Sequence, residues 1–268
     1  MYVTADGNIV DHMVNNNGSP IHAVLFDLSG TTVDEGYIRH GLAAAASEIG
    51  ARWSIDPAAS LTRLMPIMQE VSAEYAPRAY YRMSDVVCEL FARLIAEFGY
   101  AASHEELLEL EQCMWAAALP KAAATDGAID TLMLLRDAGI RTGIVSYADT
   151  RVFRGLLNQT GLAGLTDVEL CSEEVESCKP HPSIFLQALA AIDTAPANAL
   201  FVGDSIEADI IGANRVGMRT ALLSGREFNL TTDSMTEPEA QPTHRITNLI
   251  DIANLPLGLS LRAKPISA

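Results

Sequence analysis

Four short segments of the chain carry side chains that could bind and transfer a phosphate group. They are Phe26-Asp27-Leu28-Ser29-Gly30-Thr31, Ile144-Val145-Ser146, Lys179-Pro180-His181-Pro182 and Phe201-Val202-Gly203-Asp204-Ser205, the last followed by Asp209. Three of them end an apolar run, which is typical of a buried strand, and the lysine precedes a predicted helix. Because the carboxyl ends of parallel strands meet at one edge of a sheet, all four segments can converge on a single site.

The chemistry that these residue types suggest is the transfer of a phosphoryl group to a carboxylate. A phosphate monoester is a dianion, so attack by Asp27 requires that the repulsion between the two negative groups be cancelled. Asp27 and Asp204 could together hold Mg²⁺, a hard cation that favours oxygen ligands, while Lys179 adds a fixed positive charge. The hydroxyl of Ser146 and the backbone N–H of Tyr147 could donate to phosphate oxygens. In-line attack would give an aspartyl phosphate that water hydrolyses.

In their order and context, these segments resemble the motifs of the haloacid dehalogenase superfamily. The resemblance implies that Asp27 is the nucleophile and a metal ligand, that Ser29 offers its backbone carbonyl to the metal, and that Asp204 is the second carboxylate ligand. Ser146 and Lys179 match the phosphate-binding positions. The implied cofactor is Mg²⁺, and the implied substrate is a small phosphorylated molecule.

Two further residues of the fourth segment match positions that surround the metal ligands. Asp209 corresponds to the second acid of that motif, and Ser205 directly follows the metal-binding aspartate. We expect Asp209 to orient metal-bound waters or the ammonium of Lys179, as partners behind metal ligands commonly do.

Ser29 stands where the phosphatases of this superfamily usually carry a second aspartate. That aspartate protonates the leaving group and then activates water, and a positioned acid/base of this kind contributes roughly 10²- to 10⁴-fold in rate. Ser29 therefore occupies a catalytic position with an altered side chain. It cannot replace the aspartate in kind, because an unassisted hydroxyl does not exchange protons near neutral pH.

Three interpretations of this serine are open. The substrate could have a leaving group that needs little protonation, such as an acyl phosphate, a phenol or a phosphoramidate. A residue just beyond the motif could supply the proton, with Glu35, Tyr37 and His40 as the candidates. The protein could instead bind a phosphorylated ligand, in a regulatory role, with little turnover.

Residues 30–35 are also similar to the first motif of phosphonoacetaldehyde hydrolase, which likewise lacks the second aspartate. That enzyme family uses a cap lysine to form a Schiff base, and the first lysine of this chain is Lys121, so we reject that activity. L-2-haloacid dehalogenase works without the metal-binding aspartate that is intact here as Asp204. A magnesium-dependent phosphatase is thus the leading prediction, with a phospholigand-binding protein and a phosphonatase-like or other non-phosphatase hydrolase as alternatives.

The elements that must position these residues follow an alternating pattern of strands and helices. Short apolar segments at 21–28, 142–145, 168–171, 199–202 and 220–223 predict strands, and amphipathic segments at 128–138, 151–160, 182–192 and 207–215 predict helices. This alternation predicts an α/β fold with a doubly wound, Rossmann-like parallel sheet. Residues 230–242 predict a long loop, and 245–255 a last strand or helix.

Residues 36–121 interrupt the alternation with helical segments at 38–49, 60–75, 84–98 and 103–118. We therefore expect an N-terminal extension at 1–20, an α/β core at 21–35 and 122–268, and an all-helical cap at 36–121 over the carboxyl edge of the sheet. Substrate selection would come from this cap, whose most cationic and aromatic cluster is Arg78, Tyr80, Tyr81 and Arg82.

Composition excludes several other classes of protein. Hydrophobic residues make up 49% of the 268 residues and charged residues 19%, enough for a sizeable core. The net charge of −16 argues against a nucleic-acid partner, since such affinity comes largely from Lys and Arg. Four cysteines without CxxC pairing indicate free thiols. The first 20 residues do not resemble a signal peptide and no apolar run reaches about 18 residues, so we expect a cytoplasmic protein without a membrane partner.

Overall fold

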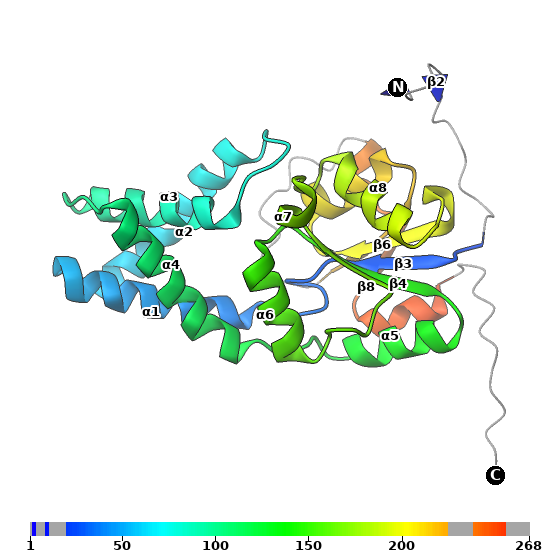
Figure 1. Ribbon diagram of the computed structural model, residues 1–268, viewed down its shortest axis with the longest axis horizontal. Coiled ribbons are helices and arrows are strands. Elements are labelled where there is room, and N and C mark those ends of the chain that lie inside the picture. Colours follow the sequence, from blue (N-terminus) through cyan, green and yellow to red (C-terminus); the bar gives the residue numbers. More distant parts are fainter. Residues whose placement is uncertain (1, 4–8, 11–19, 225–237, 256–268) are drawn as a thin grey trace, which may run out of the picture.

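The protein is built around a six-stranded parallel sheet (Figure 1). The structure, a computed structural model, describes residues 2–3, 9–10, 20–224 and 238–255. Across the sheet, the strands are β5 (Val168–Cys171), β4 (Arg141–Ser146), β3 (Ala23–Phe26), β6 (Ala199–Gly203), β7 (Arg219–Leu223) and β8 (His244–Ile246). The first segment of chemical interest thus follows a central strand.

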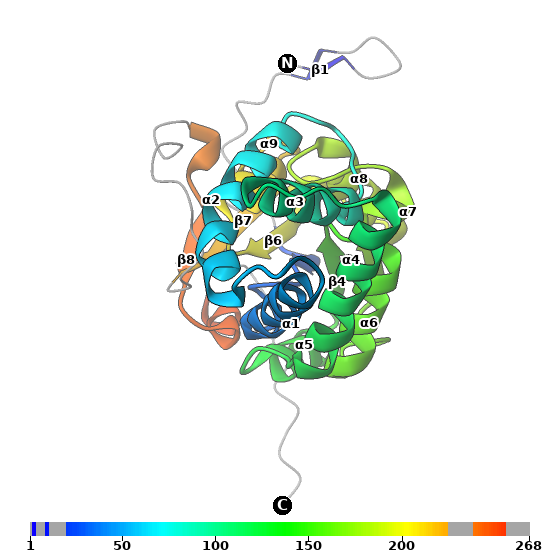
Figure 2. The ribbon, with the colours of Figure 1, turned by 90° about the vertical axis from the view of Figure 1, so that its left-hand side faces the viewer.

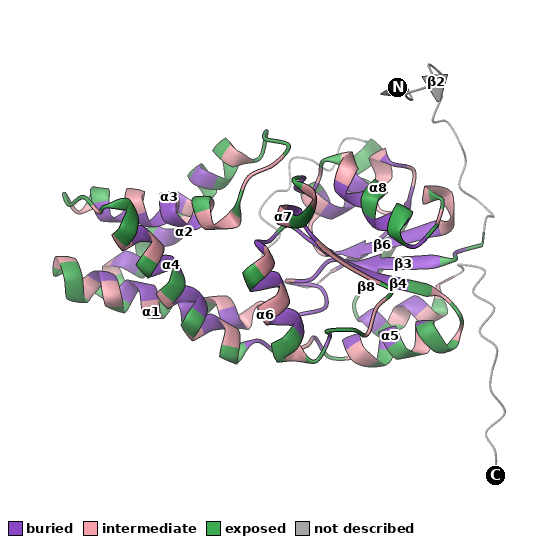
Figure 3. Cartoon of the chain, in the orientation of Figure 1, coloured by how far each residue is buried: buried purple, intermediate pink, exposed green. Residues whose placement is uncertain are grey.

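The register of the central strands brings their carboxyl ends to the same level. Phe26 of β3 lies opposite Ile144 of β4 and Val202 of β6. All residues of β3 and β6 are buried, which explains why both sequences are continuous apolar runs rather than alternating ones (Figure 3). The chain leaves these strands at Asp27, Ser146 and Asp204, so three of the four segments meet at one edge.

Helices cover both faces of the sheet, as a doubly wound fold requires (Figure 1). One face packs against α5 (Ala128–Asp137), α6 (Thr150–Thr160) and the 3₁₀-helix η6 (Leu249–Asn254), and the other against α8 (Pro182–Ala191) and α9 (Gly212–Arg215). A short helix, α7 (Ser172–Val175), follows β5. The predicted α/β fold with a parallel sheet is confirmed.

Four helices separate β3 from α5 in the chain and pack together beyond the carboxyl edge of the sheet (Figures 1 and 2). They are α1 (Gly36–Trp53), α2 (Pro57–Tyr75), α3 (Met83–Glu97) and α4 (His104–Ala118), followed by the 3₁₀-helix η1 (Leu119–Lys121). Each predicted helical segment is present with shifted ends. Local signals set two of the starts: Asp56 caps α2, and Ser103 with Glu106 forms a capping box on α4.

The two connections between these helices and the sheet run side by side. The Asp34 N–H donates to the Ala123 carbonyl at 3.0 Å, and the Thr125 N–H donates to the Thr32 carbonyl at 2.9 Å. Val33 and Ala124 form an antiparallel bridge between these bonds. The helical segment therefore leaves and re-enters the α/β part at one point.

Several predicted boundaries differ from those observed. Strand β3 is shorter than the predicted 21–28, because the chain turns after Asp27 and Gly30 adopts a positive φ of 88°. The predicted helix at 207–215 begins as a π-helical turn, η3 (Ile206–Ile211), before α9. Residues 245–255 contribute both to β8 and to η6.

The sequence also predicts features of the two ends of the chain and of the cysteines. Most of the predicted extension at 1–20 and of the loop at 230–242 lies outside the described residues, although β1 (Tyr2–Val3) pairs with β2 (Ile9–Val10) and η5 (Pro238–Ala240) precedes β8. All four cysteines carry free thiols, as expected. Among the described residues, no helix combines the length and apolar character needed to cross a membrane.

Close packing at Gly143 in β4 gives a test of the sheet. A Cβ added there would meet the side chain of Val168 and would lie 2.6 Å from Leu25 Cδ2, in the middle of the core. We expect Gly143→Ala to lower the free energy of unfolding by about 1–3 kcal/mol, because overpacking forces neighbours to shift. Urea denaturation followed by circular dichroism measures this change.

Arg141→Ala provides the control, since Arg141 lies on the same strand with an exposed side chain and only an exposed ion pair with Asp167. Its expected effect is below about 1 kcal/mol. Equal unfolding midpoints for Gly143→Ala and the wild type would contradict the packing described here.

Candidate active site

The carboxyl edge of the sheet brings Asp27, Asp204 and Lys179 together. Asp27 directly follows β3, and its N–H still donates to the Val202 carbonyl of β6 at 2.9 Å, which holds it at the strand end. Asp204 directly follows β6, while Lys179 lies in the loop before α8. Ser146 is the buried last residue of β4. The sequence-predicted residues therefore share one edge of the fold.

Lys179 is the charged centre of this edge. Its ammonium is buried and donates to Asp27 Oδ1 and, at 2.6 Å, to Asp209 Oδ1. Burial lowers the pKa of Lys179, but the negative charges and hydrogen bonds of Asp209 and Asp27 outweigh burial and raise it above its ordinary value. Lys179 therefore stays positively charged and fixes two carboxylates at once.

The acidic residues form a compact oxygen cluster around this lysine. Asp27, Asp204 and Asp209 each offer an oxygen, and these atoms lie within 4.8 Å of one another. Burial, assisted by the neighbouring carboxylates and opposed by Lys179, raises the pKa of Asp27 to about 7. Burial and Asp209 likewise raise the pKa of Asp204 to about 7. When ionised, the three carboxylates and one ammonium leave two negative charges, so the donor set fits a divalent cation such as Mg²⁺.

The turn after Asp27 is built to admit Asp204. A Cβ on Gly30 would lie 2.8 Å from Asp204 Cγ, so only glycine leaves room for that carboxylate. The Thr31 hydroxyl donates to Asp204 Oδ1 at 3.3 Å, and the Thr32 hydroxyl donates to the Asp27 carbonyl at 2.9 Å. The sequence motif gave no role to these threonines, although their hydroxyls hold both acidic residues in place.

The π-helical turn after β6 explains the placement of Asp209. The N–H groups of Asp209 and Ile210 both donate to the Ser205 carbonyl, at 3.0 and 3.2 Å, which widens this first turn. Asp209 Oδ2 accepts from the Ser205 N–H at 3.1 Å while Oδ1 accepts from Lys179. Such widened turns often occur at functional sites, and here the turn allows one carboxylate to bridge the loop and the lysine.

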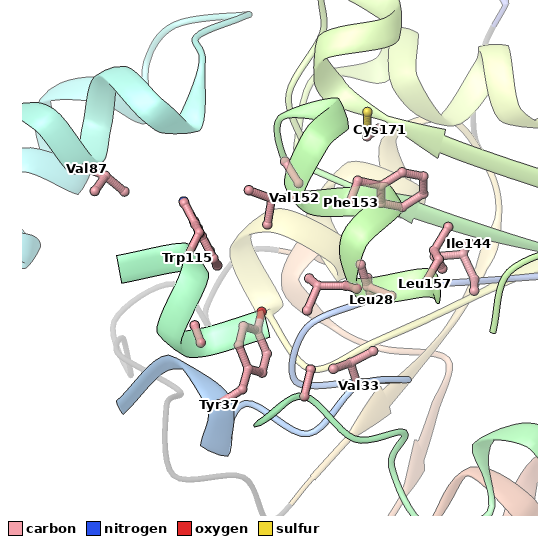
Figure 4. Close-up of a cluster of buried hydrophobic side chains, with 14 of the residues drawn as sticks. Leu28, Val33, Tyr37, Val87, Trp115, Ile144, Val152, Phe153, Leu157 and Cys171 are labelled. Atoms are coloured by element: carbon pink, nitrogen blue, oxygen red, sulfur yellow. The ribbon is translucent and has the colours of Figure 1, made fainter. Parts of the chain in front are cut away.

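Ser29 makes a hydrogen bond with the first inserted helix. Its Oγ lies 2.6 Å from the Tyr37 hydroxyl, and Tyr37 is buried beside Leu28 and Val33 (Figure 4). Burial raises the pKa of Tyr37, so this phenol stays protonated near neutral pH. Of the three residues considered as proton carriers, Tyr37 is the one bonded to Ser29, whereas His40 is exposed on α1.

The aromatic and cationic cluster of the inserted helices makes contacts within the inserted segment and with the α/β part. The guanidinium of Arg78 lies 4.0 Å from the centre of the Tyr75 ring, and Arg82 forms an ion pair with Glu173 at 3.2 Å. The Tyr81 ring packs edge-on against the Tyr75 ring, with the ring centres 5.3 Å apart. Tyr147, in the loop after β4, is 39% exposed, and its ring lies 5.6 Å from Lys179 Nζ.

Sequence analysis missed Asp149. Its buried carboxylate accepts from the Met83 and Ser84 N–H groups at 2.7 and 2.8 Å, and so joins the loop after β4 to α3. A carboxylate directly before a predicted helix is usually a cap of that helix, so the sequence contained no signal for this distant contact.

Comparison with known proteins agrees with this geometry. A family model described as haloacid dehalogenase-like hydrolase matches residues 21–217, a range that contains every residue of the acidic cluster and Lys179. This chain belongs to the haloacid dehalogenase-like hydrolase family. It is therefore a hydrolase by family.

Relatives within this haloacid dehalogenase (HAD) family share most of the chain. The ribulose-1,5-bisphosphate 5-phosphatase of Halopiger xanaduensis is 33% identical over 178 residues, covering 59% of this chain and 74% of that protein. A HAD phosphatase structure from Thermococcus onnurineus is 26% identical with a TM-score of 0.62, covering 87% of this chain and 97% of that one. The magnesium-bound HAD-hydrolase YfnB of Bacillus subtilis, 21% identical, covers 88% and 98% with a TM-score of 0.68 and shows the same fold.

The raised pKa values give a pH-dependent test of metal binding. A metal ion needs ionised ligands, and with the pKa of Asp27 and Asp204 at about 7 both titrate between pH 6 and 8. We expect Mg²⁺ affinity to rise about tenfold for each such carboxylate over that range, with proton release on binding. Isothermal titration calorimetry in buffers of different ionisation enthalpy measures both quantities.

Without metal, a rise in pH has the opposite effect and lowers the free energy of unfolding. The folded carboxyls hold their protons up to about pH 7, while the unfolded ones ionise near 3.8, so metal-free stability falls as pH rises between these values.

Asp204→Asn should weaken Mg²⁺ binding and flatten its pH dependence. An affinity that is constant from pH 6 to 8 in the wild type would contradict the predicted protonation.

Proposed function

We propose that this HAD hydrolase is a Mg²⁺-dependent phosphatase that acts on a small phosphorylated metabolite through a phosphorylated Asp27. The observation that carries the proposal is the buried Lys179 shared by Asp27 and Asp209 beside Asp204, a site with a nucleophile, a fixed cation and an all-oxygen metal cluster. The relative from Halopiger xanaduensis, which is named as a phosphatase of a sugar bisphosphate, supports this substrate class.

The residues would divide the reaction as follows. Asp27 Oδ2 attacks the phosphorus while Lys179 holds Oδ1, so the carboxylate keeps one orientation. Lys179, the Ser146 hydroxyl and the Tyr147 N–H bind phosphate oxygens. Asp27, Asp204 and the backbone carbonyl of Ser29 would hold Mg²⁺, which would neutralise charge on the phosphate when bound. Water then hydrolyses the aspartyl phosphate.

Ser29 and Tyr37 would set the preference among leaving groups. A buried neutral phenol bonded to a serine hydroxyl can donate a hydrogen bond, but neither hydroxyl replaces the second aspartate as a proton carrier near pH 7. The pair therefore favours substrates whose leaving group departs with little protonation, such as acyl phosphates and aryl phosphates. Alkyl phosphates would turn over slowly.

The inserted helices would act as a cap at 36–121 over a core formed by 21–35 and 122–268. Tyr37 and Tyr81 support this role, because the Tyr37 hydroxyl bonds to Ser29 and the Tyr81 carbonyl accepts from Cys178, the neighbour of Lys179. The second candidate function is a phospholigand-binding or regulatory protein, and Ser29 is the observation that favours it. Lys121, which is exposed and follows the four helices, gives no support to a phosphonatase-like reaction.

Removal of the nucleophile is the first test of this function. We expect wild-type protein with Mg²⁺ to release phosphate from members of a panel of acyl, aryl and alkyl phosphates, and EDTA to stop the release. Asp27→Asn should lower kcat at least about 10³-fold, because no carboxylate remains to form the intermediate. A malachite-green phosphate assay measures turnover, and trapping of ³²P on the protein measures the intermediate.

Asp137→Asn is a matched control, because this exposed residue ends α5 shortly before β4 begins and so lies toward the amino ends of the strands, away from the site. Full activity of Asp27→Asn would show that another group is the nucleophile. Metal-dependent binding of phosphate or its fluoride analogues with no turnover of any substrate would favour the ligand-binding function instead.

Restoration of the acid/base residue is the second test. In Ser29→Asp a carboxylate replaces the hydroxyl at the leaving-group position, so kcat on alkyl phosphates should rise by about 10- to 100-fold, part of the usual gain from a positioned acid/base. Turnover of acetyl phosphate should change less than threefold or so, since its leaving group needs little protonation. Equal changes for both substrate classes would contradict the role assigned to position 29.

A further inference from the structure

A short segment between two of the inserted helices forms hydrogen bonds with the active-site edge. This segment, residues 76–82 between α2 and α3, is here called the strap. The Cys178 N–H donates to the strap carbonyl of Ala79 at 2.8 Å, and the Cys178 thiol donates to the carbonyl of Tyr81 at 3.4 Å. Cys178 directly precedes Lys179, so one end of the strap is bound to the loop that carries the catalytic ammonium.

Asp149 holds the start of α3, directly after the strap. Both oxygens of this buried carboxylate accept backbone N–H groups of α3, from Met83 at 2.7 Å and Ser84 at 2.8 Å. Arg82, the N-cap residue of α3, provides no side-chain cap. The start of α3 is therefore capped by a residue of the α/β part, three positions after the phosphate-binding Ser146.

Asp149 makes this contact in place of an ordinary local one. It occupies the N-cap position of α6 but gives no side-chain hydrogen bond to that helix. Glu173 accepts the Thr150 N–H at 2.7 Å instead, and it also pairs with Arg82 at 3.2 Å. The Glu173 carboxylate thus accepts a free N–H group at the start of α6, and Asp149 can bind the start of α3 instead.

We propose that Asp149 is a positioning residue that docks the strap beside Cys178 and Lys179, at the active site, and thereby favours substrate binding. This inference rests on the proposed phosphatase function. Ser146 ends β4 and Asp149 follows three residues later, in the loop after that strand, so we expect occupation of the phosphate site and docking of the strap to stabilise each other. By reciprocity, any ligand that tightens this loop must tighten the strap by the same factor.

The physical basis is the N-terminus of α3. Its first N–H groups have no partner within the helix, and its dipole favours a negative charge at that end. A charged acceptor from the loop satisfies two of these donors, and charge-assisted hydrogen bonds are stronger than neutral ones. Water replaces the carboxylate when the strap undocks, so docking remains reversible.

Hydrogen exchange measured by mass spectrometry tests the inference directly. In Asp149→Ala, amides of the strap and of residues 83–87 should exchange about fivefold to thirtyfold faster, the range expected from loss of a helix cap. In wild-type protein with Mg²⁺, inorganic phosphate should slow exchange of the same amides, and in Asp149→Ala it should not. Asp149→Asn keeps one carbonyl acceptor and should show an intermediate effect.

Kinetics with acetyl phosphate provide the second readout. Asp149→Ala should raise KM by a similar factor of about five to thirty and leave kcat within about threefold, because Asp149 touches no reacting atom. Asp56→Ala is the matched control, since it removes a helix cap within the inserted segment. The exposed Asp56 carboxylate caps α2 by accepting the Ala58 N–H at 3.3 Å.

The outcomes separate the possibilities. Strap exchange in Asp149→Ala that equals wild type, or that changes no more than in Asp56→Ala, would overturn the inference. So would a loss of melting temperature with unchanged KM and exchange, which would show a purely structural role. The exchange arm requires no turnover, so an inactive protein on every phosphate substrate would count against the proposed phosphatase function while leaving the docking result decisive.

Discussion

The ammonium of Lys179, buried between Asp27 and Asp209, is the interaction on which the rest of the site depends. Three carboxylates crowded at the end of a buried sheet repel one another and lose their hydration, so without a cation they would not remain together in ionised form. Lys179 removes part of this cost and leaves a net charge that a divalent ion can complete. The parallel sheet provides the common edge, and the π-helical turn provides the reach of Asp209.

The same lysine links chemistry to substrate access. Its neighbour Cys178 binds the strap, and Asp149, in the loop after β4, binds the start of α3. Both contacts use backbone groups, carbonyls of the strap and N–H groups of α3, so they depend on the path of the backbone rather than on side chains of the strap. The side chains of the strap are thereby left to vary with the substrate.

Much of this arrangement could be predicted from sequence, and the misses have physical reasons. Continuous apolar runs ending in Asp27 and Asp204 predicted strand ends, because hydrophobic pattern and strand burial are directly related. The bond between Ser29 and Tyr37 and the contact of Asp149 with Met83 could not be predicted. Each depends on how two elements that pack against one another are oriented, which local sequence pattern does not encode. The π-helical turn was missed because its sequence has ordinary helical periodicity.

The paired connections at Asp34 with Ala123 and Thr32 with Thr125 have a consequence for how this architecture diversifies. The inserted helices leave and return through adjacent, hydrogen-bonded backbone positions. For the α/β part, they are therefore equivalent to a loop whose two ends are already held together. The entropy of closing a loop grows only with the logarithm of its length. Helices can therefore be lengthened, exchanged or lost at this graft point with little disturbance of the sheet. Such modularity lets one phosphate chemistry serve many substrates.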